Sequence, residues 1–162
     1  MPAPGIVNFH MPIDAEDREV IAELQSTLVE LIDLALIGKQ AHWNVEGPHF
    51  RSLHLELDEL VDTWRTLGDQ VAERGVTLGA AADGQAATVA SFSQIAPLPA
   101  GHLRDYDVIR EVADRVTEVA ARARARIDVV ASHDPVSEDL LIAVAGTLEK
   151  QLWMLRVQRP HA

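Results

Sequence analysis

The sequence of 162 residues contains no cysteine. Disulfides, thiolate metal sites and cysteine nucleophiles are therefore excluded, and any metal site must be built from imidazole and carboxylate groups. These ligands favour hard or borderline ions such as iron, manganese or zinc. Nothing in the composition calls for an oxidising compartment.

Long uncharged apolar runs and basic residues are also scarce. The start of the chain lacks the basic and apolar regions of a secretory signal, and no apolar run is long enough to span a membrane. We therefore expect a cytoplasmic protein with no membrane partner. The 25 acids against 14 bases give a net charge of −11, which disfavours attraction to nucleic acid and favours attraction of cations.

The chain is rich in apolar residues, at 48%, enough for one buried core in a single domain. Apolar residues recur at helical spacings of three and four in long stretches. Four helices are predicted: 14–44 with Asp14 as N-cap, about 49–75, Asp105 or Asp107 to about 130, and about 136–156 with Asp134 as N-cap before Pro135. Residues 1–13 are predicted as an irregular arm, 14–157 as the bundle and 158–162 as a short tail.

Residues 76–104 form an unusually long connection, rich in Ala, Gly, Ser and Pro, in which only 88–95 could form a short helix. No strand and no internal repeat is predicted. Four long helices with one long crossover between the second and third predict an all-α, ferritin-like four-helix bundle. The arginines of the third helix are predicted to form a solvated charged face; they are Arg115, Arg122, Arg124 and Arg126.

Histidines and carboxylates share one face of the second predicted helix. At about 100° per residue, His54, Asp58, Asp69 and Glu73 all project within roughly 100° of one another. His54 with Asp58, and Asp69 with Glu73, have the spacing at which two side chains reach one ion. His42 should lie level with His54 across the turn that joins the first two helices. These five residues are the predicted metal ligands.

One chain cannot close this site, because Asp58 and Asp69 are separated by about 16 Å along a helix. A two-fold axis that packs two copies of the second helix antiparallel brings His42, His54 and Asp58 opposite the carboxylates of the other subunit. The contact occurs twice, so each dimer should hold two equivalent sites.

The Glu-x-x-His pattern of di-iron bundles is not present in usable form. Glu46 and His49 have the required spacing, but Gly47-Pro48 breaks the helix between them. His49 is therefore predicted as a turn residue and not as a ligand.

The stretch Lys39–His54, followed by Asp58-Glu59 and Asp69-x-x-x-Glu73-Arg74, resembles the signature of the Dps family. This is the DNA-binding-protein-from-starved-cells branch of the ferritin superfamily. The likeness continues through the crossover to Leu148–Met154 and covers essentially the whole chain at the level of architecture.

The resemblance implies a dodecameric shell with ferroxidase centres at its two-fold interfaces. The family's ligands match His42, His54 and Asp58 of one subunit with Asp69 and Glu73 of its neighbour. The implied activity is oxidation of Fe(II) by hydrogen peroxide, or more slowly by dioxygen, with ferric oxide stored in the cavity. Removing both reactants protects against oxidative stress.

Two further roles follow from the resemblance. Trp43 matches a tryptophan beside the centre, where an indole can intercept one-electron oxidants; it is equally compatible with an aromatic residue of an interface core. Asp134, Glu138 and Asp139 match a region that lines iron-entry pores. They are equally explained as an N-cap and first-turn acids favoured by the helix dipole.

Two alternatives stay open. Imidazole and carboxylate ligands with open coordination positions could activate water in a metal-dependent amide or ester hydrolase. A DNA-compacting nucleoid protein with a vestigial iron site is the other. Strong DNA binding is not expected, because the N-terminal arm has no basic residue and the charge of −11 repels phosphate.

Overall fold

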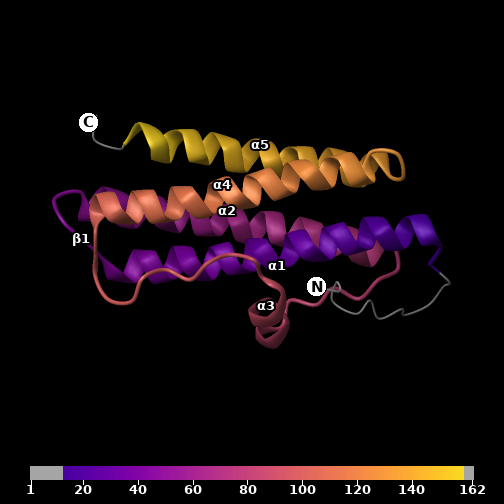
Figure 1. The fold of residues 1–162 in the computed structure, drawn as a ribbon, viewed down its shortest axis with the longest axis horizontal. Helices are drawn as coiled ribbons and strands as arrows, with labels where there is room; N and C mark the ends of the chain where they lie inside the picture. Colours follow the sequence, from indigo (N-terminus) through magenta and orange to yellow (C-terminus); the bar gives the residue numbers. More distant parts are fainter. Residues whose placement is uncertain (1–12, 159–162) are drawn as a thin grey trace.

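The computed structural model describes residues 13–158, so all of the predicted N-terminal arm except Ile13, and all of the predicted tail except Gln158, lie outside the described residues. Helices α1 (Ala15–Asn44), α2 (Phe50–Thr77), α4 (Asp105–Val130) and α5 (Pro135–Val157) form the bundle. The short α3 (Ala86–Phe92) lies outside it on the crossover (Figure 1). The predicted all-α bundle with one long connection is confirmed.

The buried core runs along the centre of the bundle. Trp64 is fully buried, and its indole N–H donates to Oε1 of Gln151 on α5 at 2.8 Å. The helix pair α1–α2 approaches closely at Gly38, where an added Cβ would lie 2.6 Å from Val61 and 2.7 Å from Trp64. This close packing holds together the two helices that carry the predicted histidines.

Most predicted helix ends are confirmed within two residues. Asp14 accepts a hydrogen bond from the backbone N–H of Asp17 at 2.8 Å, and Asp134 caps α5 ahead of Pro135. Of the two glycines predicted to stop the second helix, Gly75 lies inside α2, which continues to Thr77, and Gly79 follows the helix end with φ +94°. The predicted cap of α4 is wrong. Arg104 occupies that position, and Asp105 is the first residue of the helix.

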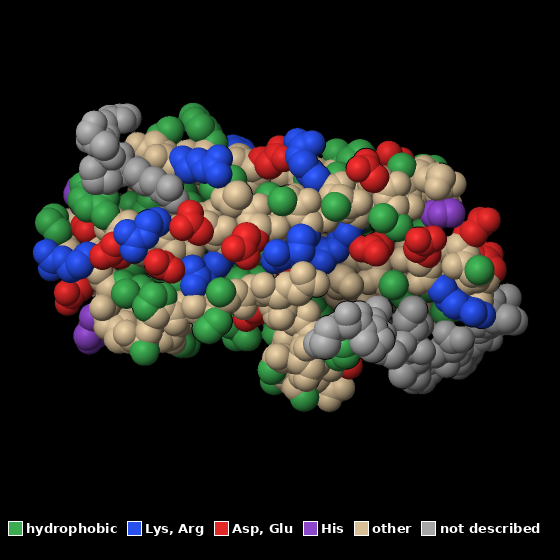
Figure 2. Space-filling view, in the orientation of Figure 1, with side chains coloured by type: hydrophobic (Ala, Val, Ile, Leu, Met, Phe, Trp, Pro, Cys, Tyr) green, Lys and Arg blue, Asp and Glu red, His purple; other side chains and the backbone are tan. Residues whose placement is uncertain are grey.

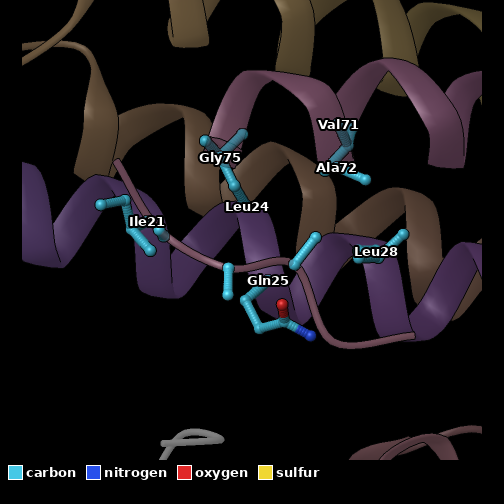
Figure 3. A pocket seen from close by; sticks show the side chains of 10 residues that line it. Ile21, Leu24, Gln25, Leu28, Val71, Ala72 and Gly75 are labelled. Carbon is cyan, nitrogen blue, oxygen red and sulfur yellow. The ribbon is translucent and has the colours of Figure 1, made fainter. Parts of the chain in front are cut away.

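The crossover is fixed to α1 by Gln25. Its side-chain amide donates to the carbonyl of Asp83 at 2.7 Å, and its oxygen accepts from the backbone N–H of Asp83 at 3.0 Å. Between this segment, α1 and α2 lies a cavity of about 10 Å³ (Figure 3). The cavity is about the size of one water molecule, so it is no substrate pocket.

The structure corrects the expectation that the chain has no strand. Val45–Glu46 (β1) pairs in parallel with Leu103–Arg104 (β2). This short ladder joins the turn after α1 to the end of the crossover. Sequence periodicity could not reveal it, because two residues are too few to show an alternating pattern.

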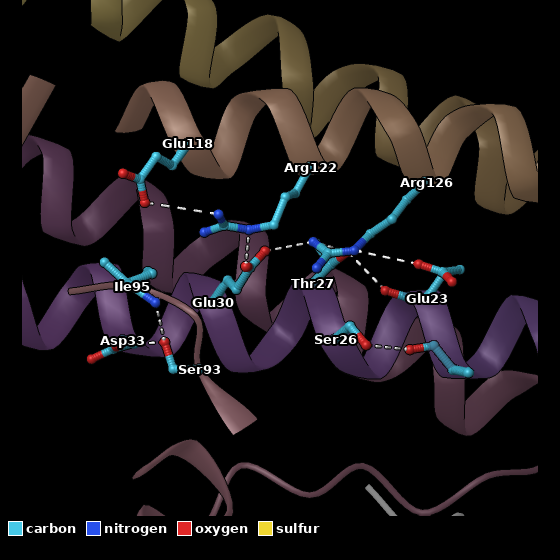
Figure 4. A network of polar contacts seen from close by, with 11 residues as sticks. Glu23, Ser26, Thr27, Glu30, Asp33, Ser93, Ile95, Glu118, Arg122 and Arg126 are labelled. Atoms are coloured by element: carbon cyan, nitrogen blue, oxygen red, sulfur yellow. Dashed lines mark hydrogen bonds and ion pairs between the residues drawn. The ribbon is translucent and has the colours of Figure 1, made fainter. Parts of the chain in front are cut away.

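The predicted solvated arginine face is wrong for three of its four members. Arg126 donates to Oε2 of the buried Glu30 at 2.6 Å, and Arg122 pairs with the other oxygen of the same carboxylate (Figure 4). Arg115 is also buried and donates to the crossover carbonyl of Ala96 at 2.7 Å. Only Arg124 keeps a largely exposed side chain. These arginines join α4 to α1 and to the crossover.

Candidate metal centre

His42 and His54 form a stacked pair at the end of the bundle where α1 turns into α2. Their ring centroids lie 3.6 Å apart with an angle of 21° between the ring planes. His42 is buried and His54 is partly buried. The sequence prediction that the two imidazoles lie level across the hairpin is therefore confirmed.

Reciprocal hydrogen bonds fix the two rings. Nδ1 of His42 donates to the carbonyl of His54 at 2.8 Å, and Nδ1 of His54 donates to the carbonyl of His42 at 3.0 Å. A carbonyl oxygen only accepts, so each Nδ1 carries a proton, and in the neutral form of each ring Nε2 is the nitrogen with the free lone pair. Anchoring of one ring nitrogen by a backbone carbonyl is the arrangement that orients histidines for metal binding through the other.

Asp58 lies beside this pair but is engaged by Lys39. Its Oδ1 is 2.6 Å from the Lys39 ammonium and 3.3 Å from Nδ1 of His42. The hydrogen bond from Lys39 is the main cause that holds the pKa of Asp58 below its ordinary value, and the two imidazoles act in the same direction. The carboxylate is therefore ionised and ready to bind a cation, with an ammonium group as competitor. Lys39 was not predicted to contact a ligand.

The Lys39→Met variant should bind Fe(II) or Co(II) a few-fold more tightly than the wild type. In this variant the metal does not have to displace an ammonium group from Asp58. The effect is small because the Lys39–Asp58 ion pair is partly exposed and therefore of modest strength. Isothermal titration with Co(II) measures the effect. Lys150→Met is the matched control, since it removes the same charge from an exposed position on α5. An unchanged affinity in Lys39→Met would show that the ammonium does not compete.

Asp69 and Glu73 lie exposed farther along α2, away from the histidine pair. Within the described part of the chain, no three histidine or acidic side chains are grouped to hold a metal ion. One subunit thus presents two separate sets of candidate ligands, and their assignment as ligands stays a prediction.

Trp43 projects from α1 with 66% of its surface exposed, and the Lys39 ammonium is 5.8 Å from its ring centroid. It lines an open groove of about 510 Å³ together with Leu36, Gln40 and Leu98. The indole is thus a neighbour of the Lys39–Asp58 pair on an uncovered surface. Its predicted role beside the centre stays a prediction.

His49 lies at the N-cap position of α2, in the turn, as predicted from the helix break at Gly47-Pro48. Its Nδ1 donates to Oδ2 of Asp105 at 2.9 Å. Asp105 is a buried carboxylate that the sequence treated only as a possible cap. Hydrogen bonds, first that from the backbone N–H of His49, hold its pKa below the ordinary value despite burial.

The predicted pore residues lie at the opposite end of the bundle, at the start of α5. Asp134 is bound by Arg74 at 2.6 Å and by Ser137, so its charge is already paired. Burial alone would raise its pKa, but these hydrogen bonds outweigh burial and lower it. Asp139 is exposed and Glu138 is partly exposed. Within one subunit, Asp134 therefore acts as a cap and an ion-pair partner.

Comparison with known proteins agrees with this fold. Residues 21–159 match the Ferritin-like domain family. A DNA protection during starvation protein of Agrobacterium fabrum is 39% identical over 150 residues, which cover 90% of each chain. The Mycobacterium smegmatis Dps structure superposes with a TM-score of 0.88 at 31% identity, covering 96% of each chain. Dps from Microbacterium arborescens, solved in a high iron form, gives 0.81 at 31% identity, covering 90% of this chain and 96% of that one.

The bundle with its long crossover, together with the family match over residues 21–159, defines a protein of the ferritin-like class. Within that class, the chain belongs to the Dps family. This membership implies iron binding, iron storage and protection against oxidative stress. In the described residues, no helix is long and apolar enough to cross a membrane.

Proposed function

We propose that this protein oxidises Fe(II) at centres shared between two subunits and stores the ferric product inside a dodecameric cytoplasmic shell. The observation that carries the proposal is the reciprocal hydrogen bonding of His42 and His54, which leaves both Nε2 atoms as metal ligands beside an ionised Asp58. Family membership supports iron as the metal and substrate.

The second half of each centre comes from a neighbouring subunit. Asp69 and Glu73 are exposed on α2 and lie too far along the helix to reach the histidine pair of their own chain. Asp69 borders an open groove of about 350 Å³ that is lined mainly by apolar residues of α1 and α2, including Leu36. A second copy of the chain related by two-fold symmetry would cover this exposed apolar surface. It would also bring its own histidine pair to Asp69 and Glu73.

The ligand set suits the proposed oxidation. Carboxylates favour the hard Fe(III) product, and a centre with few protein ligands keeps positions open for the oxidant. Each peroxide accepts one electron from each of two Fe(II) ions, takes up two protons and leaves as two water molecules. No hydroxyl radical is released in this step. Trp43, exposed beside Lys39, is placed to give up an electron to any oxidant that escapes.

Iron entry is assigned to the acidic start of α5. Among the residues described, Arg74 forms an ion pair with Asp134 and not with Glu138 or Asp139. Glu138 and Asp139 are therefore the carboxylates that could attract Fe(II) where several subunits meet. Asp134 contributes by fixing the helix start that presents them.

Co-assembly of two inactive variants tests the shared centre. His54→Ala removes one half of the ligands and Glu73→Ala removes the other. If equal amounts assemble at random, half of the dimers are mixed and each carries one intact centre, so about a quarter of wild-type Fe(II) oxidation should return. The rate is followed by absorbance of the ferric product after peroxide is added under anaerobic conditions.

The separately assembled variants, mixed without subunit exchange, are the matched control and should stay inactive. No recovery in co-assembled shells, with correct assembly shown by light scattering, would contradict a centre shared between subunits. Full activity of either variant alone would contradict the ligand assignment.

Among residues 13–158, no specific feature supports either alternative activity. The cavity between α1, α2 and the crossover holds about one water molecule, and the larger grooves beside Trp43 and Asp69 are open surface. On the face shown in Figure 2, basic side chains alternate with acidic ones and do not gather into a patch. Strong DNA binding is therefore not part of the proposal; a gel-shift titration showing tight, steeply salt-dependent retention of DNA would contradict this.

A further inference from the structure

Asp105 is a buried carboxylate that joins the start of α4 to the turn between α1 and α2. It is 2% exposed, and it lies 56 residues from its main partner, His49. Oδ2 accepts hydrogen bonds from the backbone N–H and from Nδ1 of His49, both at 2.9 Å, and Oδ1 accepts from the backbone N–H of Tyr106 at 2.9 Å. One side chain thus satisfies three donors.

The turn is shaped around this carboxylate. Helix α2 has no capping bond from the side chain of its own N-cap residue, His49, and Asp105 supplies an acceptor there from a distant part of the chain. Gly47 has φ +131°, and an added Cβ would lie 2.8 Å from the carboxylate of Asp105. Only glycine allows this approach without strain.

Further contacts tie the same two segments together. The β1–β2 ladder pairs Val45 with Leu103 and Glu46 with Arg104, and the last two side chains also form an ion pair at 3.6 Å. That ion pair is exposed and weak, so Asp105 is the side chain that adds buried hydrogen bonds to the backbone ladder. Figure 1 shows the start of α4 and the α1–α2 turn at the same end of the bundle.

This turn sets the register of the metal ligands. His42 lies in the last turn of α1 and His54 in the first turns of α2, so the path of the chain between them determines whether each ring meets the carbonyl of the other. We infer that Asp105 is a positioning residue of the metal centre, which holds the α1–α2 turn so that His42 and His54 stay paired for metal binding. The inference rests on the proposed function.

The test compares Asp105→Asn with Asp107→Asn in the full shell. Both remove one negative charge from the first turn of α4, but Asp107 is partly exposed and pairs only with Arg110 among the contacts described. In Asp105→Asn, the amide cannot accept at both of its terminal atoms, so the turn loses an acceptor. We expect Co(II) affinity to fall about tenfold, as for loss of a residue that orients metal ligands.

The kinetic pattern separates positioning from general damage. The KM for Fe(II) should rise in step with the loss of Co(II) affinity, whereas the rate at saturating iron should change much less. Asp107→Asn should match the wild type in both. His49→Ala keeps the backbone hydrogen bond to Asp105 and loses the side-chain one, so its KM should rise by a smaller factor.

Wild type and His54→Ala are measured in the same assay. If the wild type oxidises Fe(II), His54→Ala does not, and Asp105→Asn binds Co(II) like the wild type, the inference about Asp105 is overturned and the proposed function stands. If the wild type shows no saturable oxidation, the proposed function itself fails. Should Asp105→Asn not assemble, an unchanged KM in His49→Ala overturns the inference instead.

Discussion

Replacing His54 with alanine should lower the rate of saturable Fe(II) oxidation about a hundredfold, at the upper end of what loss of a residue supporting a metal site costs. The variant loses one Nε2 ligand directly. It also loses the ring that stacks on His42 at 3.6 Å, so the remaining histidine is free to turn away. Asp58→Ala should have a comparable effect, since it removes the adjoining carboxylate.

The matched control is His133→Ala. His133 lies in the α4–α5 turn at the far end of the bundle, where its Nε2 is 3.6 Å from Glu19. Like His54→Ala, this variant loses one histidine, but it leaves His42, His54 and Asp58 unchanged. Oxidation should therefore stay at the wild-type rate. Both variants must first be shown to assemble, by size-exclusion chromatography with light scattering. Unchanged oxidation in assembled His54→Ala would refute the site assignment.

Glu30→Ala should lower the free energy of unfolding by about 3–5 kcal/mol, the usual cost of breaking a buried ion pair from one side. Glu30 is 1% exposed, and its two carboxylate oxygens bind Arg122 and Arg126 of α4. Its loss leaves two cations at a packed helix interface. Arg126 then retains only longer contacts, to Glu23 and to the hydroxyl of Thr27, both at 3.4 Å. Urea unfolding followed by circular dichroism measures the change.

Glu149→Ala provides the comparison for that measurement. It breaks the pair with Arg124, in which both side chains are substantially exposed, so little change in stability is expected. Protein concentration must be the same for all variants, because the stability of an oligomer depends on it. Equal midpoints for Glu30→Ala and Glu149→Ala would show that the network of Figure 4 adds no more than a surface pair.

Local patterns were enough to predict the helices and the histidine pair. Apolar spacing marked the four long helices, and Asp14 and Asp134 marked two helix starts, because periodicity and capping depend on neighbours in sequence. His42 and His54 could be placed side by side because a short turn between antiparallel helices leaves little freedom of register.

Contacts between distant residues were missed for a physical reason. Arg122 and Arg126 looked like a solvated face, but the rotation of α4 against α1 directs them at Glu30. Lys39 reaches Asp58, and Asp105 reaches His49, only because the packed helices and the returning crossover bring them together. The spacing of residues in a helix predicts which side chains share a face of that helix, but it does not predict which other element packs against that face.

The sequence by itself thus determined the class of fold. It also predicted the histidine and carboxylate ligands, and predicted that a second subunit completes the site, since the rise of an α-helix separates Asp58 from Asp69 by about 16 Å. Only the tertiary structure decided which charged side chains are buried, that Lys39 pairs with Asp58, and that Asp105 binds the turn at His49. These depend on long-range packing, which local sequence patterns do not encode.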